Sequence, residues 1–174
     1  MKEQPKKPSK TRDIRLSVEI KASPKRIYQA LTSARALCRW WLEGAETNAK
    51  NMGRFRLLWP TIKTSGEKSK RLFPPHTATG DVSGVFVDLE VGKKIAWIWE
   101  VTPKWKHPPL STIFIEAHGQ HSKVTLIHPG FSTKPRLAKY LMGACAGWED
   151  CLAKLKTYLE TGKTMKSQIL ALKD

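Results

Sequence analysis

Histidine, cysteine and tryptophan are the residues of this chain whose side chains are best suited to chemistry or ligand binding. The five histidines and three cysteines show no spacing typical of a metal site or of a nucleophilic catalyst. No two histidines lie four residues apart, and neither a Gly-x-Ser-x-Gly motif nor a phosphate-binding glycine loop occurs. This pattern favours a non-enzymatic protein, with no catalytic residue, no metal and no cofactor.

Three cysteines are too few for a disulfide framework. Cys145 and Cys151 lie six residues apart in one helical segment, so their side chains point in different directions, and Cys145 is interpreted as a core thiol. The first residues are polar and basic, and no apolar run approaches the ~20 residues that span a bilayer. We therefore expect a cytoplasmic protein without a membrane span.

The seven tryptophans indicate either a bulky core or a binding cavity. Trp105 lies in a proline-flanked loop, and six others fall in segments that should face the core: Trp40, Trp41, Trp59, Trp97, Trp99 and Trp148. His128 shares a strand face with Val124 and Leu126, so it is either a structural histidine or a group that orients a ligand hydroxyl or carboxylate.

Several segments have the periodicity of the elements that would position these residues. Residues 13–21 alternate between apolar and polar, which predicts a strand with one buried face. Ser23 and Pro24 predict the start of a short helix, and residues 34–42 form a second helical pattern that Gly44 is placed to end. Short apolar runs separated by turn residues then predict antiparallel strands over 55–59, 81–90, 95–101, 111–118 and 123–128.

The strongest periodic signal lies between Pro135 and Glu160. Apolar residues recur there at steps of three and four, at Leu137, Leu141, Cys145, Trp148, Leu152, Leu155 and Leu159. They predict a helix about 37 Å long, ended by Gly162 as a C-cap. The predicted sheet is the only large partner available to bury its apolar stripe.

Much of the net charge of +16 lies in two segments of low apolar content. Residues 1–12 carry five basic residues and one acidic residue. Residues 61–78 carry four basic residues and one acidic residue. We interpret the first as a flexible basic tail and the second as a long basic loop. Both favour solubility, and both leave open the binding of nucleic acid or of an anionic surface.

The chain resembles the SRPBCC (START-like) superfamily, and within it the family named after the activator of heat-shock-protein-90 ATPase. The resemblance covers roughly residues 13–162 and rests on several short segments taken together. These segments are Ile20–Thr32, Leu37–Trp41, Met52–Leu57, Gly80–Val87, Lys94–Trp99, Val124–Phe131 and Gly147–Gly162. The basic segments and Pro129 depart from the family pattern.

The resemblance implies an α+β helix-grip fold, in which a curved antiparallel sheet wraps around a long C-terminal helix and two short helices join strands one and two. It predicts one SRPBCC/START-like domain over residues 13–162, between the tail of residues 1–12 and a C-terminal tail of residues 163–174. It also implies a cavity between the sheet and the long helix.

We therefore expect a ligand-binding domain for a hydrophobic or amphipathic small molecule, lipid-like or aromatic. Two alternatives stay open: a co-chaperone-like module that binds a chaperone or another protein, and binding of nucleic acid or an anionic surface through the basic segments. The candidate ligand-binding residues are Trp40, Trp41, Phe55, Trp97, Trp99, His128, Phe131, Cys145 and Trp148.

Overall fold

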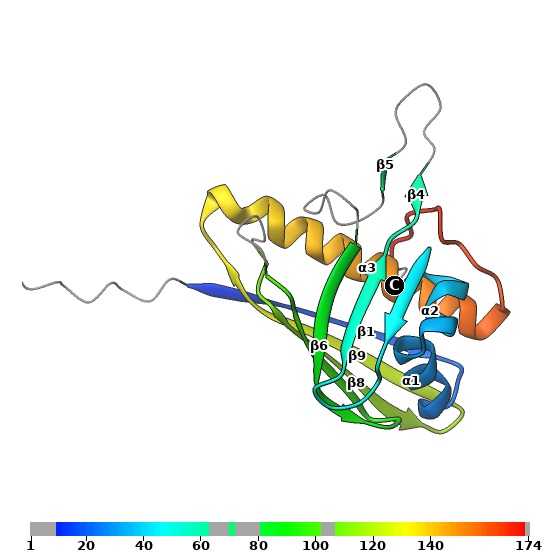
Figure 1. Ribbon diagram of the computed structural model, residues 1–174. Coiled ribbons are helices and arrows are strands. Elements are labelled where there is room, and N and C mark those ends of the chain that lie inside the picture. The colour runs from blue at the N-terminus through cyan, green and yellow to red at the C-terminus, as the bar shows by residue number, and fades with distance from the viewer. Residues whose placement is uncertain (1–9, 63–69, 72–80, 102–106, 173–174) are drawn as a thin grey trace, which may run out of the picture.

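The computed structural model describes residues 10–62, 70–71, 81–101 and 107–172, and these residues form an α+β helix-grip fold. A curved antiparallel sheet with strand order β1-β9-β8-β7-β6-β3-β2 wraps around the long helix α3, and the short helices α1 and α2 pack near the C-terminal end of that helix (Figure 1). In chain order the elements are β1 (Thr11–Ile20), α1 (Pro24–Thr32), α2 (Ala34–Trp40), β2 (Gly44–Thr47), β3 (Arg54–Leu58), β4 (Thr61–Ile62), β5 (Lys70–Arg71), β6 (Asp81–Glu90), β7 (Lys94–Trp99), β8 (Leu110–His118), β9 (His121–Ser132), the 3-10 turn η1 (Pro135–Leu137) and α3 (Ala138–Thr161).

Strand β1 has the one-sided burial that its alternating sequence predicts. Ile14 and Ile20 are buried, and Leu16 and Val18 are partly buried on the same face. The strand pairs antiparallel with β9, the last strand of the sheet, so the start of the described chain lies beside its final third. This pairing leaves β1 at one edge of the sheet and β2 at the other.

The two short helices are joined through one serine. Ser33 caps the end of α1, and its hydroxyl accepts a hydrogen bond from Ala36 N at the start of α2. The prediction that the second helix runs to Leu42 is wrong, because α2 ends at Trp40 and Gly44 begins strand β2. Sequence analysis missed β2 because this four-residue edge strand has no alternating apolar pattern.

The long helix is confirmed, with a later start than the sequence predicted. Pro135 opens a 3-10 turn, and regular α-helix begins only at Ala138. The predicted C-cap is present: Gly162 has φ of 73°, and its N–H donates to the Tyr158 carbonyl. A left-handed conformation of this kind strongly favours glycine.

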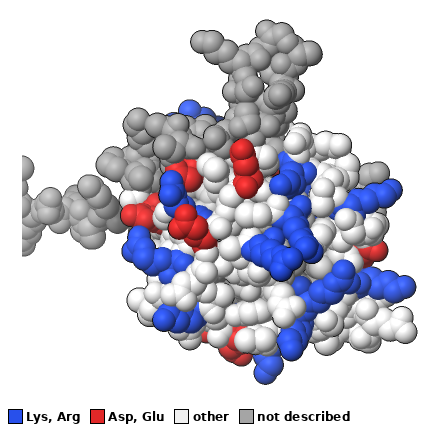
Figure 2. Space-filling view, turned by 45° about the vertical axis from the view of Figure 1, so that its right-hand side comes forward, with Lys and Arg blue, Asp and Glu red and all other residues white. Residues whose placement is uncertain are grey.

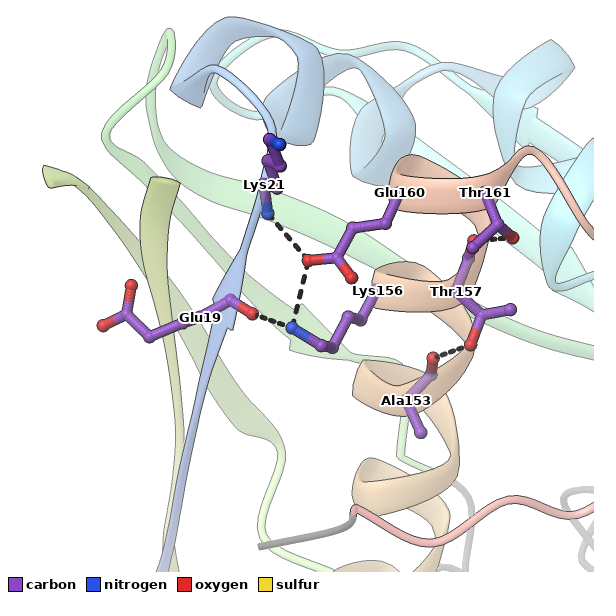
Figure 3. A network of polar contacts seen from close by, with 7 residues as sticks. All are labelled: Glu19, Lys21, Ala153, Lys156, Thr157, Glu160 and Thr161. Carbon is purple, nitrogen blue, oxygen red and sulfur yellow. Dashed lines mark hydrogen bonds and ion pairs between the residues drawn. The ribbon is translucent and has the colours of Figure 1, made fainter. Parts of the chain in front are cut away.

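A polar network joins the end of α3 to the end of β1 (Figure 3). The Glu160 carboxylate accepts from Lys21 N at 2.8 Å and from Lys156 Nζ at 3.0 Å, and Lys156 also donates to the Glu19 carbonyl. The Thr157 and Thr161 hydroxyls donate to carbonyls one helical turn earlier, which satisfies them within the helix. The network sets the position of this helix end against the sheet.

Residues 163–172, which the sequence predicts as a tail, pack against the domain in the structure. Lys166 Nζ donates to the carbonyls of Cys38 and Leu42 at 2.8 and 3.2 Å, which ties this segment to the end of α2. Residues 1–9 of the basic tail and most of the basic loop, residues 63–69 and 72–78, lie outside the described residues. Among the described residues, no helix is both long and apolar enough to cross a bilayer.

Candidate ligand-binding cavity

A cavity of about 290 Å³, here called the outer cavity, lies between the sheet, the first half of α3 and the C-terminal segment. Its walls combine four tryptophans with small residues of α3 and few polar groups. They are Trp41, Trp59, Val82, Trp99, His107, His128, Gly143, Ala144, Ala146, Gly147, Trp148, Asp150 and Ile169. Its size is near the lower end of pockets that hold drug-sized molecules.

The cavity exists because α3 presents small side chains there. Gly143, Ala144, Ala146 and Gly147 line it, and a Cβ atom added at Gly143 would meet no heavy atom within 4 Å. Two to three turns later, the same helix buries large side chains such as Leu155, which is 0% exposed. The cavity therefore lies beside the part of the helix that carries small residues.

Aromatic rings pack against one another in and behind the wall of the outer cavity. The ring centroids of Trp97 and Trp99 lie 5.6 Å apart, and those of Trp99 and Trp148 lie 6.4 Å apart. Trp41 and Trp59 form a second edge-to-face pair at 5.4 Å. Such contacts orient the indoles, so the wall they form is largely preorganised.

His128 holds Trp148 in place. The indole Nε1 of Trp148 donates to His128 Nδ1 at 3.0 Å, so the other ring nitrogen, Nε2, carries the proton and donates to the Pro108 carbonyl at 2.7 Å. Burial lowers the pKa of His128, although the hydrogen bond to Pro108 opposes the shift. The imidazole is therefore neutral at pH 7, and both its nitrogens are occupied by protein groups.

A second, smaller cavity of about 40 Å³, here called the inner cavity, lies deeper in the core. It shares Trp41, Trp99 and Trp148 with the outer cavity. Its other walls are Leu31, Leu37, Thr47, Phe55, Leu57, Phe86, Ile95, Trp97, Ile113 and Cys151. The two cavities therefore have three indoles in common.

Phe55 reaches the inner cavity because the facing strand has no side chain at Gly84. A Cβ at Gly84 would lie 2.3 Å from Phe55 Cζ and 2.6 Å from the Ile98 carbonyl oxygen. Both atoms belong to neighbouring strands of the sheet, so neither can move far. Glycine at this position lets the Phe55 ring lie across β6.

The structure brings most of the predicted binding residues together. Trp41, Trp99, His128 and Trp148 line the outer cavity, and Phe55 and Trp97 line the inner one. The three remaining predicted residues line neither cavity and instead pack elsewhere: Trp40, Phe131 and Cys145.

Each of these three residues has another contact. Trp40 donates its Nε1 hydrogen to the Ala30 carbonyl at 3.0 Å, which fastens α2 to α1. Phe131 packs edge-on against the His128 ring, with centroids 4.7 Å apart. Burial and the nearby Glu149 carboxylate raise the pKa of the Cys145 thiol, which donates to that carboxylate.

Sequence reasoning did not select several residues of the outer cavity, namely Trp59, Val82, His107, Gly143, Ala144, Ala146, Gly147, Asp150 and Ile169. The small residues between Gly143 and Gly147 were a signal that could have been used, because small side chains leave space beside a helix. No sequence pattern predicted Ile169, which reaches the cavity only because the C-terminal segment folds back.

Asp150 connects the cavity wall to that segment. One carboxylate oxygen of Asp150 accepts from Lys154 Nζ at 2.7 Å, and the other accepts from Leu170 N at 2.6 Å. The Lys154 side chain is only 1% exposed, and its ammonium also donates to the Lys166 carbonyl. These contacts hold Ile169 beside the cavity, and they occupy both oxygens of Asp150.

A metal centre is not formed by the residues that the structure describes, because no three His, Cys, Asp or Glu side chains among them come close enough together. The polar groups with known partners at the cavity, His128 and Asp150, bind protein atoms. The arrangement is suited to enclosing an apolar molecule rather than to acid-base chemistry.

The sequence profile of the family described as "Activator of Hsp90 ATPase homolog 1-like protein" matches residues 21–160. The chain belongs to this family. The match includes the short helices, the sheet from β2 to β9 and all of α3 but its last residue, and so confirms the resemblance predicted from sequence. Ile169 and the rest of the C-terminal segment lie beyond the matched region.

The solved structures that share this fold include the following three. The Aha1 dimer from Colwellia psychrerythraea is 23% identical, has a TM-score of 0.64, and aligns over 87% of this chain and 98% of its own. Protein SSP2350 from Staphylococcus saprophyticus is 19% identical, with a TM-score of 0.66 over 91% and 98% of the two chains. CalU16 from Micromonospora echinospora is 16% identical, with a TM-score of 0.58 over 87% and 78%.

These identities establish a shared fold. A comparison with curated proteins found no match to this chain.

Proposed function

We propose that the domain binds a hydrophobic or amphipathic small molecule, aromatic or lipid-like, in the outer cavity. The observation that carries this proposal is the cavity of about 290 Å³ with four tryptophans in its wall. Burial of apolar ligand surface contributes about 25 cal/mol per Å², so shape and apolar area dominate recognition in such a site. The small volume favours molecules of two or three fused rings or a short acyl chain over larger lipids.

The wall is built for binding rather than for turnover. The indole of Trp148 is fixed by its hydrogen bond to His128, and that of Trp99 by one to Ser111 Oγ at 3.1 Å. A ligand placed against these rings loses little further protein entropy on binding, since the rings are already ordered. Enclosure of the ligand, without a covalent step, is the role that these contacts support.

A thermal-shift experiment tests the proposal with two probes, fluorene as an aromatic molecule and dodecanoate as a lipid-like one. A probe at 100 times its dissociation constant should add about 2.7 kcal/mol to the free energy of unfolding. For a domain of this size, the midpoint of thermal unfolding then rises by roughly 5–10 °C. Binding should also change the fluorescence of the tryptophans in the wall.

Two helix variants provide the matched control. Ala144 is 5% exposed and lines the outer cavity, so Ala144→Phe should fill the cavity and abolish the shift with both probes. Met142 is 70% exposed on the same helix and lines no cavity, so Met142→Phe should bind as the wild type does. The proposal is wrong if neither probe raises the unfolding temperature of the wild-type protein.

A second candidate function, binding of an acidic protein partner such as a chaperone, is supported by the charge of the short helices. Lys25, Arg26, Arg35 and Arg39 are exposed there, and residues 21–42 contain no acidic residue. In the right-hand half of Figure 2, Lys and Arg side chains predominate over Asp and Glu. The family description, which names an activator of Hsp90 ATPase, agrees with such a role.

Charge reversal tests this second candidate. The double variant Arg35→Glu, Arg39→Glu should abolish binding to purified Hsp90 in a pull-down at low salt, because both positions are exposed. Lys139→Glu, at an exposed position at the other end of α3, serves as the control and should bind normally. Absence of wild-type binding, or binding that is unaffected by the double variant, would count against it.

A further inference from the structure

Trp97 carries an unpartnered polar atom in the core. Its side chain is 6% exposed, and Nε1 is the one buried side-chain nitrogen or oxygen in the described part of the chain without a hydrogen-bond partner. Three other buried indoles do have partners: Trp40 donates to the Ala30 carbonyl, Trp99 to Ser111 and Trp148 to His128. Buried N–H groups are almost always paired, so an unpaired one points to a missing acceptor.

Trp97 lies where an acceptor from a bound molecule could reach it. Its indole lines the inner cavity, and its ring centroid lies 5.9 Å from that of Trp148, a wall of both cavities. About 40 Å³ holds a carbonyl or hydroxyl group, because a water-sized probe needs about 10–15 Å³, but it does not hold a second ring. A narrow group at one end of a ligand therefore fits this space, and to enter it from the outer cavity the group must pass the indoles that line both cavities.

The walls of the inner cavity select an uncharged acceptor. No lysine, arginine or histidine of the described residues lines it. Its other polar side chains are Thr47, whose hydroxyl accepts from Ala34 N, and Cys151, whose thiol is fully buried. Because a buried anion without a counter-charge is strongly disfavoured, a carboxylate is excluded in favour of a ketone, aldehyde, ether or hydroxyl oxygen.

We infer that the ligand of this domain is an apolar molecule with an uncharged hydrogen-bond acceptor at one end, and that this acceptor enters the inner cavity and accepts from Trp97 Nε1. This inference rests on the proposed small-molecule function and adds the chemical class of the ligand. The outer cavity selects ligands by the size and shape of their apolar part, and Trp97 selects those with an acceptor oxygen at one end.

A matched pair of probes tests the inference. Fluorene and 9-fluorenone have nearly the same shape, but only the ketone carries an acceptor. Isothermal titration of the wild-type protein should give a dissociation constant about tenfold lower for 9-fluorenone, the effect of one buried hydrogen bond. Trp97→Phe removes the N–H and should bring the ratio of the two dissociation constants to about one.

Trp99→Phe is the control variant. Trp99 borders both cavities, but its N–H already donates to Ser111, so this change should weaken both probes equally and preserve the ratio. The comparison on the wild-type protein decides the matter even if Trp97→Phe does not fold. Equal affinity for the two probes overturns this inference and leaves the proposed function standing, whereas failure of fluorene, 9-fluorenone and dodecanoate alike to bind overturns both.

A resident water is the competing partner for Trp97. It would give a nuclear Overhauser effect between solvent and the Trp97 indole proton in the free protein, which 9-fluorenone should abolish by displacing the water. Persistence of that signal in the saturated complex would overturn the inference, because the acceptor would then not reach Trp97.

Discussion

The C-terminal half of α3, residues 151–161, and its N-terminal half, residues 138–150, cross the same sheet but contact it differently. The C-terminal half buries large side chains such as Leu152 and Leu155, both 0% exposed, and is joined to β1 by the network of Glu160 and Lys156 (Figure 3). The N-terminal half lines the outer cavity with glycines and alanines. One helix thus supplies both the stability of the fold and the space for a ligand.

This difference follows from packing rather than from helix propensity. A side chain that fills its space gains dispersion contacts on all sides, and a gap loses them. Two indoles in the cavity wall are held by hydrogen bonds, Trp99 of the sheet to Ser111 and Trp148 of α3 to His128. The open half therefore costs stability that the packed half must provide, and substitutions along the helix should reveal this division.

The largest effect is expected from a comparison of two single leucine-to-alanine substitutions, one in each half of α3. Leu155→Ala removes a side chain that is 0% exposed and should lower the free energy of unfolding by about 3 kcal/mol. Leu141→Ala, in the open half where the leucine is only partly buried, should cost about 1 kcal/mol. Urea unfolding of both variants measures the difference, and equal losses would contradict the division of the helix.

The next largest loss of unfolding free energy is expected when the histidine that holds Trp148 is replaced. His128→Phe leaves the buried Trp148 Nε1 and the Pro108 carbonyl without their partner, at a cost of about 2 kcal/mol at pH 7.5. The pKa of His128 is lowered in the folded protein, so its contribution is fully present above the unfolded value near 6.5 and is lost as pH falls through the folded value.

The stability of the wild-type protein should therefore approach that of His128→Phe between about pH 7 and pH 5. Urea unfolding across this range measures the convergence. His118→Phe is the control, because that side chain is 52% exposed and should change stability little at any pH. A gap between wild type and His128→Phe that stays constant down to pH 5 would contradict the buried neutral histidine.

A smaller effect, of opposite sign, is expected in the open half. Because a Cβ at Gly143 meets no atom within 4 Å, Gly143→Ala should raise the free energy of unfolding by about 0.5–1 kcal/mol through helix propensity alone. The methyl group should also weaken the binding of fluorene slightly, since the residue lines the outer cavity. Thermal unfolding and titration of the same variant check both outcomes, and destabilisation would contradict the open space.

The smallest effect concerns the polar network at the packed end. Partial burial acts to raise the pKa of Glu160, but hydrogen bonds from Lys21 N and Lys156 lower it by more, so the net pKa is below the ordinary value. Glu160→Gln should cost about 0.5 kcal/mol at pH 7, and this difference should vanish as pH falls below about 4. Chemical unfolding at the two pH values measures it, and a cost that persists in acid would show that charge is not involved.

Much of the fold could be predicted from local sequence patterns. The alternation of Ile14 and Ile20 with polar residues predicted β1, and the spacing of Trp148, Leu152 and Leu155 predicted the packed half of α3. Strand β2 was not predicted, because this short edge strand has no periodic pattern of apolar residues. Trp40 was expected in the cavity but packs between helices, because periodicity shows only that a residue is buried and does not show what it contacts.

The amino-acid sequence by itself determined which faces of the strands and of α3 are apolar, where the long helix ends at Gly162, and that tryptophans enrich the core. Tertiary structure alone decided that His128 meets Trp148, that Asp150 holds the segment carrying Ile169, and that Trp97 is left without an acceptor. The physical reason is that burial of a face follows from local periodicity, whereas a hydrogen bond or a cavity depends on the relative positions of elements far apart in the chain.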